Sequence, residues 1–275
     1  MTDLIKKRPI VSVIMGVYNC AVTLKSATDC IINQTYTNWE LIMCDDGSTD
    51  NTFDIAQKIK NENPSRVIKV LQNEKNMGLN YTLNKCLKEA GGEYIARMDG
   101  DDLCSPERFE QELTIFETEP EISIVSTDME FFDESGVWGR ISHPDYPQPK
   151  DLVYRPPFCH APCMVKREAY DAVDGYTVNK KLLRVEDYHL WLKMYAKGYR
   201  GKNIHIPLYQ MRDDKNATRR KDFNNYLNAS YVKYLVVKEL KLPKWMYVYT
   251  LKPIITGLVP KELYESIHKK RLKKS

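Results

Sequence analysis

Three aspartates that follow an apolar run form the first group of residues able to do chemistry. Asp99, Asp101 and Asp102 lie in the segment MDGDD, where Gly100 allows a sharp turn. A Mg²⁺ or Mn²⁺ ion held by one or two carboxylates can neutralise a diphosphate leaving group while keeping phosphate and water ligands. Alternate residues at a strand end share one side, which places Asp99 and Asp101 together. The alternative is a solvated acidic turn that caps a helix beginning near Pro106.

A second acidic cluster, DDGSTD at positions 45–50, also follows an apolar run. Its carboxylates could accept hydrogen bonds from a base N–H or a ribose hydroxyl. The alternative is a helix N-cap, in which Ser48 or Asp50 accepts hydrogen bonds from the first amides of the next helix. Both predictions can hold together, with Asp45 and Asp46 binding a nucleoside and Asp50 capping the helix.

The pair Glu186 and Asp187 opens a third candidate segment, a predicted helix over residues 186–196 that Gly198 closes. Helical spacing turns a set of larger side chains inward, namely Tyr188, Trp191, Leu192 and Tyr195. The two carboxylates then lie at the rim of the site. The alternative is that both acids only stabilise the positive end of the helix.

An alternation of strands and helices must position these residues. Apolar runs rich in β-branched residues predict strands, and amphipathic stretches between them predict helices. The strands are expected at 10–17, 39–45, 66–73 and 93–98, and the helices at 22–34, 52–61 and 78–90. This order predicts a parallel sheet with helices on both faces, and ligands in such sheets bind beyond the carboxyl ends of the strands. Tyr18, Asn19 and both aspartate clusters fall at those ends.

Composition excludes several classes of protein. The 275 residues suffice for one large domain with a modest extension. The seven cysteines form no CxxC pair, which argues for reduced thiols and against a zinc site. No uncharged apolar stretch reaches the roughly 18 residues of a spanning helix, and the start, Met1 to Arg8, is polar and basic. We therefore expect a soluble or peripheral protein.

Charge is divided unevenly along the chain. Residues 212–275 hold 16 Lys and Arg against 6 Asp and Glu, a net charge of +10, whereas residues 1–211 hold 25 against 31, a net charge of −6. A basic tail on an acidic body predicts an anionic partner.

Four segments in order carry a family resemblance: VSVIMGVYN, DDGSTD, NMGLNYTLNKCLKEAGGEYIARMDGDD and VEDYHLWLKM. Over residues 9–215 the chain resembles glycosyltransferase family 2, inverting enzymes with the GT-A fold, an α/β nucleotide-sugar-binding domain with a mostly parallel sheet. The resemblance implies transfer of a hexose or N-acetylhexosamine from a UDP-sugar to an acceptor hydroxyl, assisted by Mn²⁺ or Mg²⁺. The product would be a surface polysaccharide or lipid-linked oligosaccharide, made in the cytoplasm at the inner face of the cell membrane.

The resemblance also implies a domain division and a donor site. Residues 1–215 would form the transferase domain, with a nucleotide-binding half at 9–105 and an acceptor half at 106–215. The donor residues would be Val17 and Tyr18 at the base, Asp45 and Asp46 at base and ribose, Asn76 near the nucleotide, Asp99 and Asp101 as the DXD motif at ribose and metal, and Asp102 toward the sugar or acceptor.

Four more residues take implied roles. Asp187 would be the general base that deprotonates the acceptor, with Glu186 beside it. His160, in the segment HAP, would lie near the acceptor and donor sugar, unless it is a hydrogen-bonded structural histidine. Arg212 would meet the pyrophosphate, unless it belongs to an exposed basic loop.

Residues 216–275 are expected to form a basic, amphipathic helical extension. Residues 222–240 predict a helix with six apolar residues broadly on one side: Tyr226, Leu227, Tyr231, Tyr234, Leu235 and Val237. The segments WMYVYTLKPIITGLVP and HKKRLKK add aromatic residues and lysines, a combination typical of an anionic membrane surface. The alternative is ordinary packing of a helical subdomain.

Two other functions are alternatives, and the first of them shares this α/β layout. A sugar-phosphate nucleotidylyltransferase would need a glycine-rich basic loop after the first strand, but GVYNCAVTLK supplies one glycine. A non-catalytic sugar-nucleotide or glycan-binding module would not need Asp101 together with Asp187. Dehydrogenase and P-loop functions are excluded because no GxGxxG or GxxxxGK[ST] segment follows a strand. We expect no nucleic-acid partner.

Overall fold

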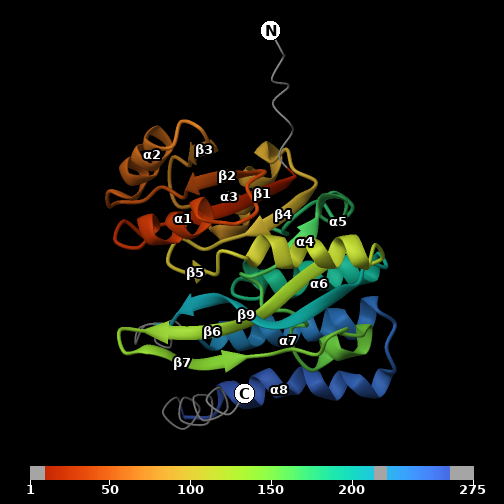
Figure 1. Ribbon diagram of the computed structural model, residues 1–275. Coiled ribbons are helices and arrows are strands. Elements are labelled where there is room, and N and C mark those ends of the chain that lie inside the picture. The colour runs from red at the N-terminus through yellow and green to blue at the C-terminus, as the bar shows by residue number, and fades with distance from the viewer. Residues whose placement is uncertain (1–9, 214–221, 261–275) are drawn as a thin grey trace.

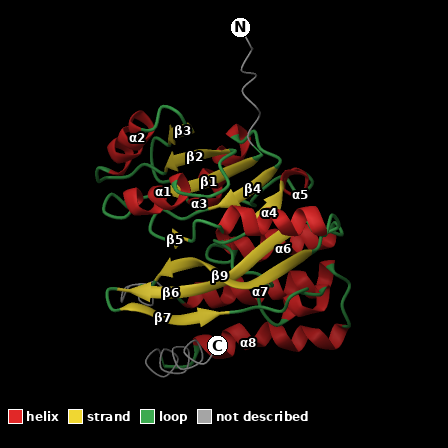
Figure 2. Ribbon diagram, viewed as in Figure 1, coloured by secondary structure: helices red, strands yellow, loops and turns green. Residues whose placement is uncertain are grey.

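A twisted mixed sheet forms the centre of the protein (Figures 1 and 2). The structure is a computed structural model, and it describes residues 10–213 and 222–260. Within these residues nine strands pair in the order β3-β2-β1-β4-β8-β6-β9-β5, and β7 pairs with β6.

The first four strands are parallel, as predicted. They are β1 (Val11–Val17), β2 (Trp39–Asp45), β3 (Val67–Gln72) and β4 (Tyr94–Arg97), and the helices that connect them are α1 (Leu24–Ile32), α2 (Thr52–Glu62) and α3 (Leu79–Glu89). The register pairs Val17 with Asp45 at the carboxyl ends of β1 and β2. The loops that follow these strands therefore meet at one edge of the sheet.

The second half of the sheet mixes directions. Its strands are β5 (Leu103–Cys104), β6 (Ile124–Asp133), β7 (Gly136–Ile141), β8 (Met164–Lys166) and β9 (Gly201–Arg212). The three-residue β8 runs antiparallel to both β4 and β6, whereas β6 and β9 are parallel. The parallel arrangement predicted from the alternation is thus concentrated in β1–β4.

The remaining helices surround this second half. They are α4 (Arg108–Thr118), α5 (Arg167–Asp171), α6 (Glu186–Ala196), α7 (Phe223–Glu239) and α8 (Leu251–Gly257), with the 3₁₀ helices η1 (Pro149–Val153), η2 (Lys180–Leu182) and η4 (Lys244–Thr250). The predicted bounds of α6 and its inward residues are confirmed, because Tyr188, Trp191, Leu192 and Tyr195 are all buried.

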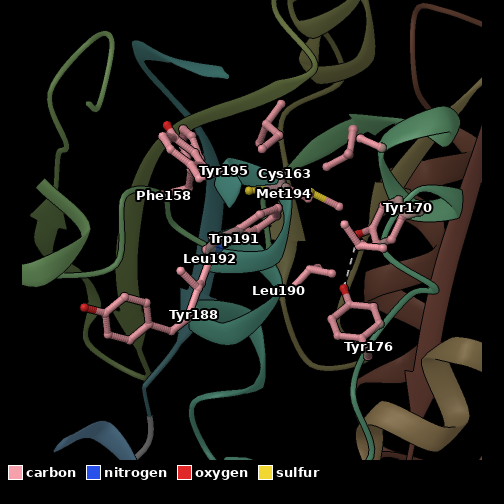
Figure 3. Close-up of a cluster of buried hydrophobic side chains, with 14 of the residues drawn as sticks. Phe158, Cys163, Tyr170, Tyr176, Tyr188, Leu190, Trp191, Leu192, Met194 and Tyr195 are labelled. Carbon is pink, nitrogen blue, oxygen red and sulfur yellow. Dashed lines mark hydrogen bonds between the residues drawn. The ribbon is translucent and has the colours of Figure 1, made fainter. Parts of the chain in front are cut away.

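Apolar side chains cover both faces of the sheet, as expected for buried parallel strands. Alternate residues of β1 enter different clusters: Ile14 joins the cluster around α6, while Val13 and Met15 join the cluster around α1 and α4. Figure 3 shows the first cluster, where Trp191 packs edge-on against Phe158 with ring centroids 5.4 Å apart. This packing fixes α6 and therefore the two acids at its start.

Helix α7 packs on the protein mainly through residues outside the predicted apolar side. Val232, Val236 and Val237 are buried in the cluster with α6, whereas Leu227, Tyr231 and Tyr234 are exposed. Of the six residues predicted to lie broadly on one side, only Val237 is fully buried, so α7 packs mainly through a different side. The reason is that α7 carries apolar residues on two sides, and tertiary packing selected the side with the small β-branched residues.

Two further predictions concern cysteines and membrane spans. All seven cysteines are free, as expected. Across residues 10–213 and 222–260, no helix has the length and apolarity needed to cross a membrane. The basic start Met1–Arg8 and the segment HKKRLKK lie outside the described residues.

Candidate active site

The loop after β1 is tied to the loop after β2. The carbonyl of Val17 accepts a hydrogen bond from the Asp46 amide at 2.8 Å. Asn19, whose φ is +50°, accepts from the Thr49 amide at 2.9 Å, and its own amide donates to Ser48 Oγ at 2.9 Å. Val17 is buried and Tyr18 is 47% exposed beside it. An exposed aromatic ring next to an ordered loop suits stacking on a nucleobase.

Asp45 and Asp46 are both buried and hydrogen-bonded within the protein. Asp45 accepts from the amide and hydroxyl of Ser48 and from Gln72 Nε2. Asp46 accepts from the Met77 and Gly78 amides at 2.8 and 2.9 Å. Their first effect is to organise the loops around the expected nucleoside position.

Asp50 accepts from the first amide of α2 as predicted, although the N-cap residue itself is Asn51. Asp50 Oδ1 accepts from the amide of Thr52, the first residue of α2, at 3.0 Å, and its Oδ2 accepts from the Ala21 amide at 3.2 Å. Asp50 thus ties the start of α2 to the β1–α1 loop.

Loop 73–78 lies against the DDG turn. Gly47 has φ of +70°, and a Cβ there would lie 2.5 Å from the Lys75 carbonyl carbon, so only glycine fits. The buried Asn73 donates to Asp46 Oδ1 at 2.8 Å. Asn76, in contrast, is exposed. Asn73 therefore organises this loop, and Asn76 lies at its surface.

The MDGDD turn closely approaches the end of β1. A Cβ on Gly100 would lie 2.9 Å from Cys20 Sγ and 3.0 Å from Val17 Cγ1. Asp99 is held by Arg97 through two bonds of 2.9 and 3.0 Å. Asp101 is exposed. The predicted nucleoside and metal residues therefore meet at one edge of the sheet.

Asp102 points into the protein and joins this turn to β9. It accepts from the Tyr209 hydroxyl at 2.9 Å and from the Arg212 amide at 2.8 Å. Burial, followed by the charges of Asp99 and Asp101, raises the pKa of Asp102 well above its ordinary value. Arg212 Nε also donates to the Asp101 carbonyl at 3.1 Å, so Arg212 lies beside the aspartate turn.

Glu186 and Asp187 occupy the first turn of α6, and both are half-buried. Asp187 Oδ1 accepts from the Tyr188 amide at 2.8 Å. Burial raises the pKa of Asp187 above its ordinary value, although the Tyr188 amide and the charge of Arg97 act to lower it. Burial and then Asp187 raise the pKa of Glu186, against the lowering effect of Arg97. A carboxylate with a raised pKa is suited to general-base catalysis near neutral pH.

Arg97 connects the aspartate turn with these two acids. The residue is 5% exposed and pairs with Asp99, and its charge acts on both Glu186 and Asp187. Its Nη1 atom is buried and has no hydrogen-bond partner within the described residues.

Other polar atoms near α6 also lack partners among the described residues. Both ring nitrogens of His160 and Oε2 of Glu186 are buried without a hydrogen bond. The His160 ring packs against Trp191, with centroids 5.7 Å apart. The structural alternative for His160 thus has no hydrogen-bond partner among the described residues. Buried polar atoms without partners are costly, so a polar ligand would stabilise this region.

Comparison of the sequence with family models identifies the family. Residues 12–174 match the family model described as Glycosyl transferase family 2. The chain belongs to this family. It is 41% identical to a Bacillus subtilis (strain 168) protein named "Putative glycosyltransferase EpsE", over 96% of this chain and 95% of that protein. It is 32% identical to the Escherichia coli protein WfaP, over 72% of this chain and 74% of WfaP, whose full name is UDP-Glc:alpha-D-GlcNAc-diphosphoundecaprenol beta-1,3-glucosyltransferase.

Solved structures agree on the fold of this family 2 glycosyltransferase. TarS of S. aureus in complex with UDP-GlcNAc matches with a TM-score of 0.67 at 18% identity, over 90% of this chain and 71% of that one. The mannosyltransferase PcManGT of Pyrobaculum calidifontis, in complex with GDP-Man and Mn²⁺, matches with a TM-score of 0.62 at 19% identity, over 96% and 80%. The protein thus has the predicted GT-A fold.

The aspartate turn of this family 2 enzyme suits a divalent cation that is completed by its substrate. Within residues 10–213 and 222–260, no three His, Cys, Asp or Glu side chains are grouped as a self-sufficient metal site. Mg²⁺ is commonly bound by one or two carboxylates together with substrate phosphates and water. Asp101 and Asp99 provide such carboxylates, while Asp102 points toward β9.

Sequence reasoning missed two residues of the site, Arg97 and Asn73. Arg97 is a charged residue that ends a strand otherwise made of Tyr, Ile and Ala, and it stands two positions before Asp99 on the same side. A charged residue at this position of an apolar strand could have been identified from the sequence as a candidate site residue. Asn73 gave no such signal, because its partners Asp46 and Thr82 come from other elements.

Proposed function

We propose that this glycosyltransferase is an inverting enzyme that transfers a hexose or N-acetylhexosamine from a UDP-sugar to an acceptor hydroxyl. The observation that carries the proposal is the position of Arg97, which pairs with Asp99 in the aspartate turn and acts electrostatically on the acids of α6. This link supports our proposal that the aspartate turn binds the diphosphate and that a carboxylate of α6 acts as the base of the same site.

The donor would bind along the edge formed by the loops after β1, β2 and β4. Tyr18 would stack on the base, and Asp45 and Asp46 would receive hydrogen bonds from the nucleoside with their remaining lone pairs. Asp101 and Asp99 would hold a Mn²⁺ or Mg²⁺ ion, which neutralises charge on the diphosphate when bound. Arg212, beside the Asp101 carbonyl, would add a positive charge near the pyrophosphate.

Asp187 would act as the general base. Its carboxylate takes the proton of the acceptor hydroxyl while the hydroxyl oxygen forms a bond to the anomeric carbon. The bond from that carbon to the diphosphate oxygen breaks, and the nucleoside diphosphate leaves on the opposite face. Glu186 and His160, whose buried polar atoms have no described partner, would bind hydroxyls of the sugars.

The names of the relatives support the substrate classes. WfaP is named for UDP-glucose and a diphosphoundecaprenol acceptor, and TarS was solved with UDP-GlcNAc. We assign this chain to the synthesis of a surface polysaccharide or a lipid-linked oligosaccharide. The transfer reaction would take place in the cytoplasm, at the inner face of the cell membrane.

A nucleotide-sugar screen with Mn²⁺ tests this function. We expect release of UDP from one UDP-sugar, faster with a glycan or lipid-linked acceptor, and its loss in EDTA with recovery on added Mn²⁺ or Mg²⁺. Undiminished transfer in the presence of chelator would show that Asp99 and Asp101 do not hold a metal ion needed for transfer. Formation of a nucleotide sugar from a sugar phosphate would instead identify a nucleotidylyltransferase, and donor binding without turnover by any acceptor would identify a binding module.

A further inference from the structure

An apolar ridge runs along the surface of η4 and α8. Five large apolar side chains in this segment are between 51% and 72% exposed. They are Trp245, Val248, Leu251, Ile255 and Leu258, and we call this set the terminal ridge. We propose that the terminal ridge is a docking surface that inserts into the interface of a bilayer containing anionic lipid.

Helix geometry aligns the ridge along one side. Residues three apart superimpose in a 3₁₀ helix, which places Trp245 and Val248 in a line along η4, with Leu251 next at the first residue of α8. Steps of four and three residues continue that line through Ile255 of α8 and Leu258, the C-cap residue of that helix. The residues that face the protein from the same segment, Met246 and Pro253, are buried. The segment therefore carries apolar residues on two sides, one packed in the core and the other exposed at the surface.

Contacts with α7 hold the ridge in place without a ligand. Ser230 Oγ of α7 donates to the Thr250 carbonyl at 2.7 Å. A Cβ on Gly257 would lie 2.8 Å from Tyr226 Cδ2, so α8 approaches α7 closely. Figure 1 shows α8 at an outer edge of the molecule, beside α7. The ridge is thus a preformed surface.

Lysines accompany the ridge. Lys238, Lys241, Lys244 and Lys252 are all exposed in this part of the chain, and Glu239 is the single acid between Phe223 and Pro260. Residues 212–275 as a whole carry +10. Aromatic and aliphatic residues combined with lysines are typical of surfaces that lie at the boundary of headgroups and acyl chains. Lysines are depleted in protein–protein interfaces, whereas lysines beside exposed aromatic and aliphatic side chains suit anionic headgroups and acyl chains, so a lipid surface fits better.

The ridge is linked to the start of α6 through α7. Asn228 Nδ2 donates to the Leu183 carbonyl at 3.1 Å, and the Lys181 ammonium lies 5.8 Å from the centroid of the Tyr231 ring. Leu183 stands three residues before Glu186. If the proposed function holds, docking would fix the acids of α6 relative to a lipid-linked acceptor. Docking itself does not depend on that function.

Tryptophan fluorescence and vesicle flotation of the full chain test the proposal. Trp245 is 62% exposed, whereas Trp39 and Trp191 are buried and Trp138 is partly buried. We expect a blue shift of emission with phosphatidylglycerol–phosphatidylcholine vesicles, and loss of most of that shift in Trp245→Phe. The double variant Trp245→Glu with Ile255→Glu should lower the partition coefficient at least about tenfold, because two charged side chains would enter the apolar boundary.

Matched variants separate apolar insertion from charge. Val22 is 95% exposed in the loop before α1, so Val22→Glu adds the same kind of charge without disturbing packing, and we expect unchanged vesicle binding. Lys244→Gln and Lys252→Gln should each weaken binding about fivefold at low salt, and hardly at high salt. Unchanged flotation of the double glutamate variant would overturn the proposal. Equal weakening of vesicle binding by Val22→Glu would also overturn it.

A third contrary result is a dimer that forms at high protein concentration, is disrupted by the ridge variants and appears without any vesicle binding. The occupant of the ridge would then be a second copy of the chain. Flotation needs no nucleotide sugar, so its outcome is separate from that of the transfer assay.

Discussion

We call the proposed donor-binding edge, formed by the loops after β1, β2 and β4, the donor edge. The donor edge and the region around α6 differ in how many of their polar groups have hydrogen-bond partners. At the donor edge, Asp45, Asp46 and Asp50 receive hydrogen bonds from backbone amides and neighbouring side chains. Around α6, five of the eight buried side-chain atoms without a partner in the described residues belong to His160, Glu186, His189 and Trp191. The donor edge is organised before any ligand binds, whereas the region around α6 retains unmet hydrogen-bonding capacity.

This difference indicates a division of labour. Preorganised loops lose little conformational entropy when a nucleotide binds, which favours donor affinity. Unpaired polar groups become useful when a hydroxyl or a developing charge completes them, which favours chemistry over ground-state affinity. We therefore expect substitutions at the donor edge to lower stability and donor binding together, and substitutions around α6 to lower turnover without lowering stability or donor binding.

The largest expected effect concerns the base. Asp187→Asn keeps the shape of the side chain but removes its basicity, and general-base catalysis is typically worth about 10² to 10⁴ in rate. We expect the rate of transfer to fall at least about a hundredfold, with nucleotide affinity nearly unchanged in calorimetry. For the wild type, transfer should decline as pH falls through the raised pKa of Asp187. A parallel loss of nucleotide affinity would place Asp187 in the donor site and remove the contrast between the regions.

Asp46→Ala tests the other side of the comparison. Asp46 accepts from Asn73, Met77 and Gly78, and removal of a buried charged acceptor costs about 1.5–3 kcal/mol. We expect the free energy of unfolding in urea to fall by that amount and donor affinity to fall with it. The exposed Asp54→Ala in α2 is the control and should change stability by less than about 0.5 kcal/mol. If the Asp46→Ala variant were as stable as the wild type but bound no nucleotide, Asp46 would contact the ligand directly and would not stabilise the loops.

Arg97 belongs to both regions, so its variants should sharpen the comparison. Arg97→Lys keeps the charge but loses the paired bonds to Asp99, and we expect a decrease in transfer of about tenfold. Arg97→Met also removes a charge that lowers the pKa of Asp187 and Glu186. The acid limb of its pH–rate profile should therefore move to higher pH, while that of Arg97→Lys stays in place. Identical profiles for both variants would limit Arg97 to a packing role.

Glu186→Gln should have the smallest effect on stability. Burial raises the pKa of Glu186 in the folded protein, so protonation stabilises the fold and stability from this group is lost as pH rises through that pKa. The glutamine variant removes this loss. At neutral pH we expect its free energy of unfolding to equal or exceed that of the wild type by less than about 1 kcal/mol, with the difference shrinking as pH falls. Clear destabilisation at neutral pH would mean that the Glu186 charge has an effective partner, contrary to the contrast drawn here.

The position of the site could be predicted from the sequence, but the bonding within it could not. The carboxyl ends of parallel strands share an edge, so the segments around Asp45 and Asp99 had to meet there. The same pattern could not reveal that Asp102 turns inward toward Tyr209, because that partner comes from a strand 107 residues away. The periodicity of apolar residues predicts helices and strands, whereas the hydrogen-bond partner of a side chain is determined only when the sheet has assembled.

Helix α7 shows a similar limit. Its sequence carries apolar residues on two sides, and periodicity cannot state which side packs when both are apolar. The structure buries Val232 and Val236 and leaves Tyr231 and Tyr234 at the surface. The prediction of a helix over these residues was confirmed, but its orientation depended on the shape of the surface offered by α6 and η1.

The link between Asp102 and β9 also has a consequence for the order of folding. The partners of Asp102 stand 107 and 110 residues further along the chain. Contacts of such long sequence separation form slowly, because the intervening loop must first be closed. During synthesis, a chain that has emerged only as far as α6 already contains every strand of the donor edge, yet the aspartate turn still lacks the hydroxyl and the amide that hold it. We therefore expect the aspartate turn to reach its folded geometry late, after residue 212 has emerged and β9 has joined β6.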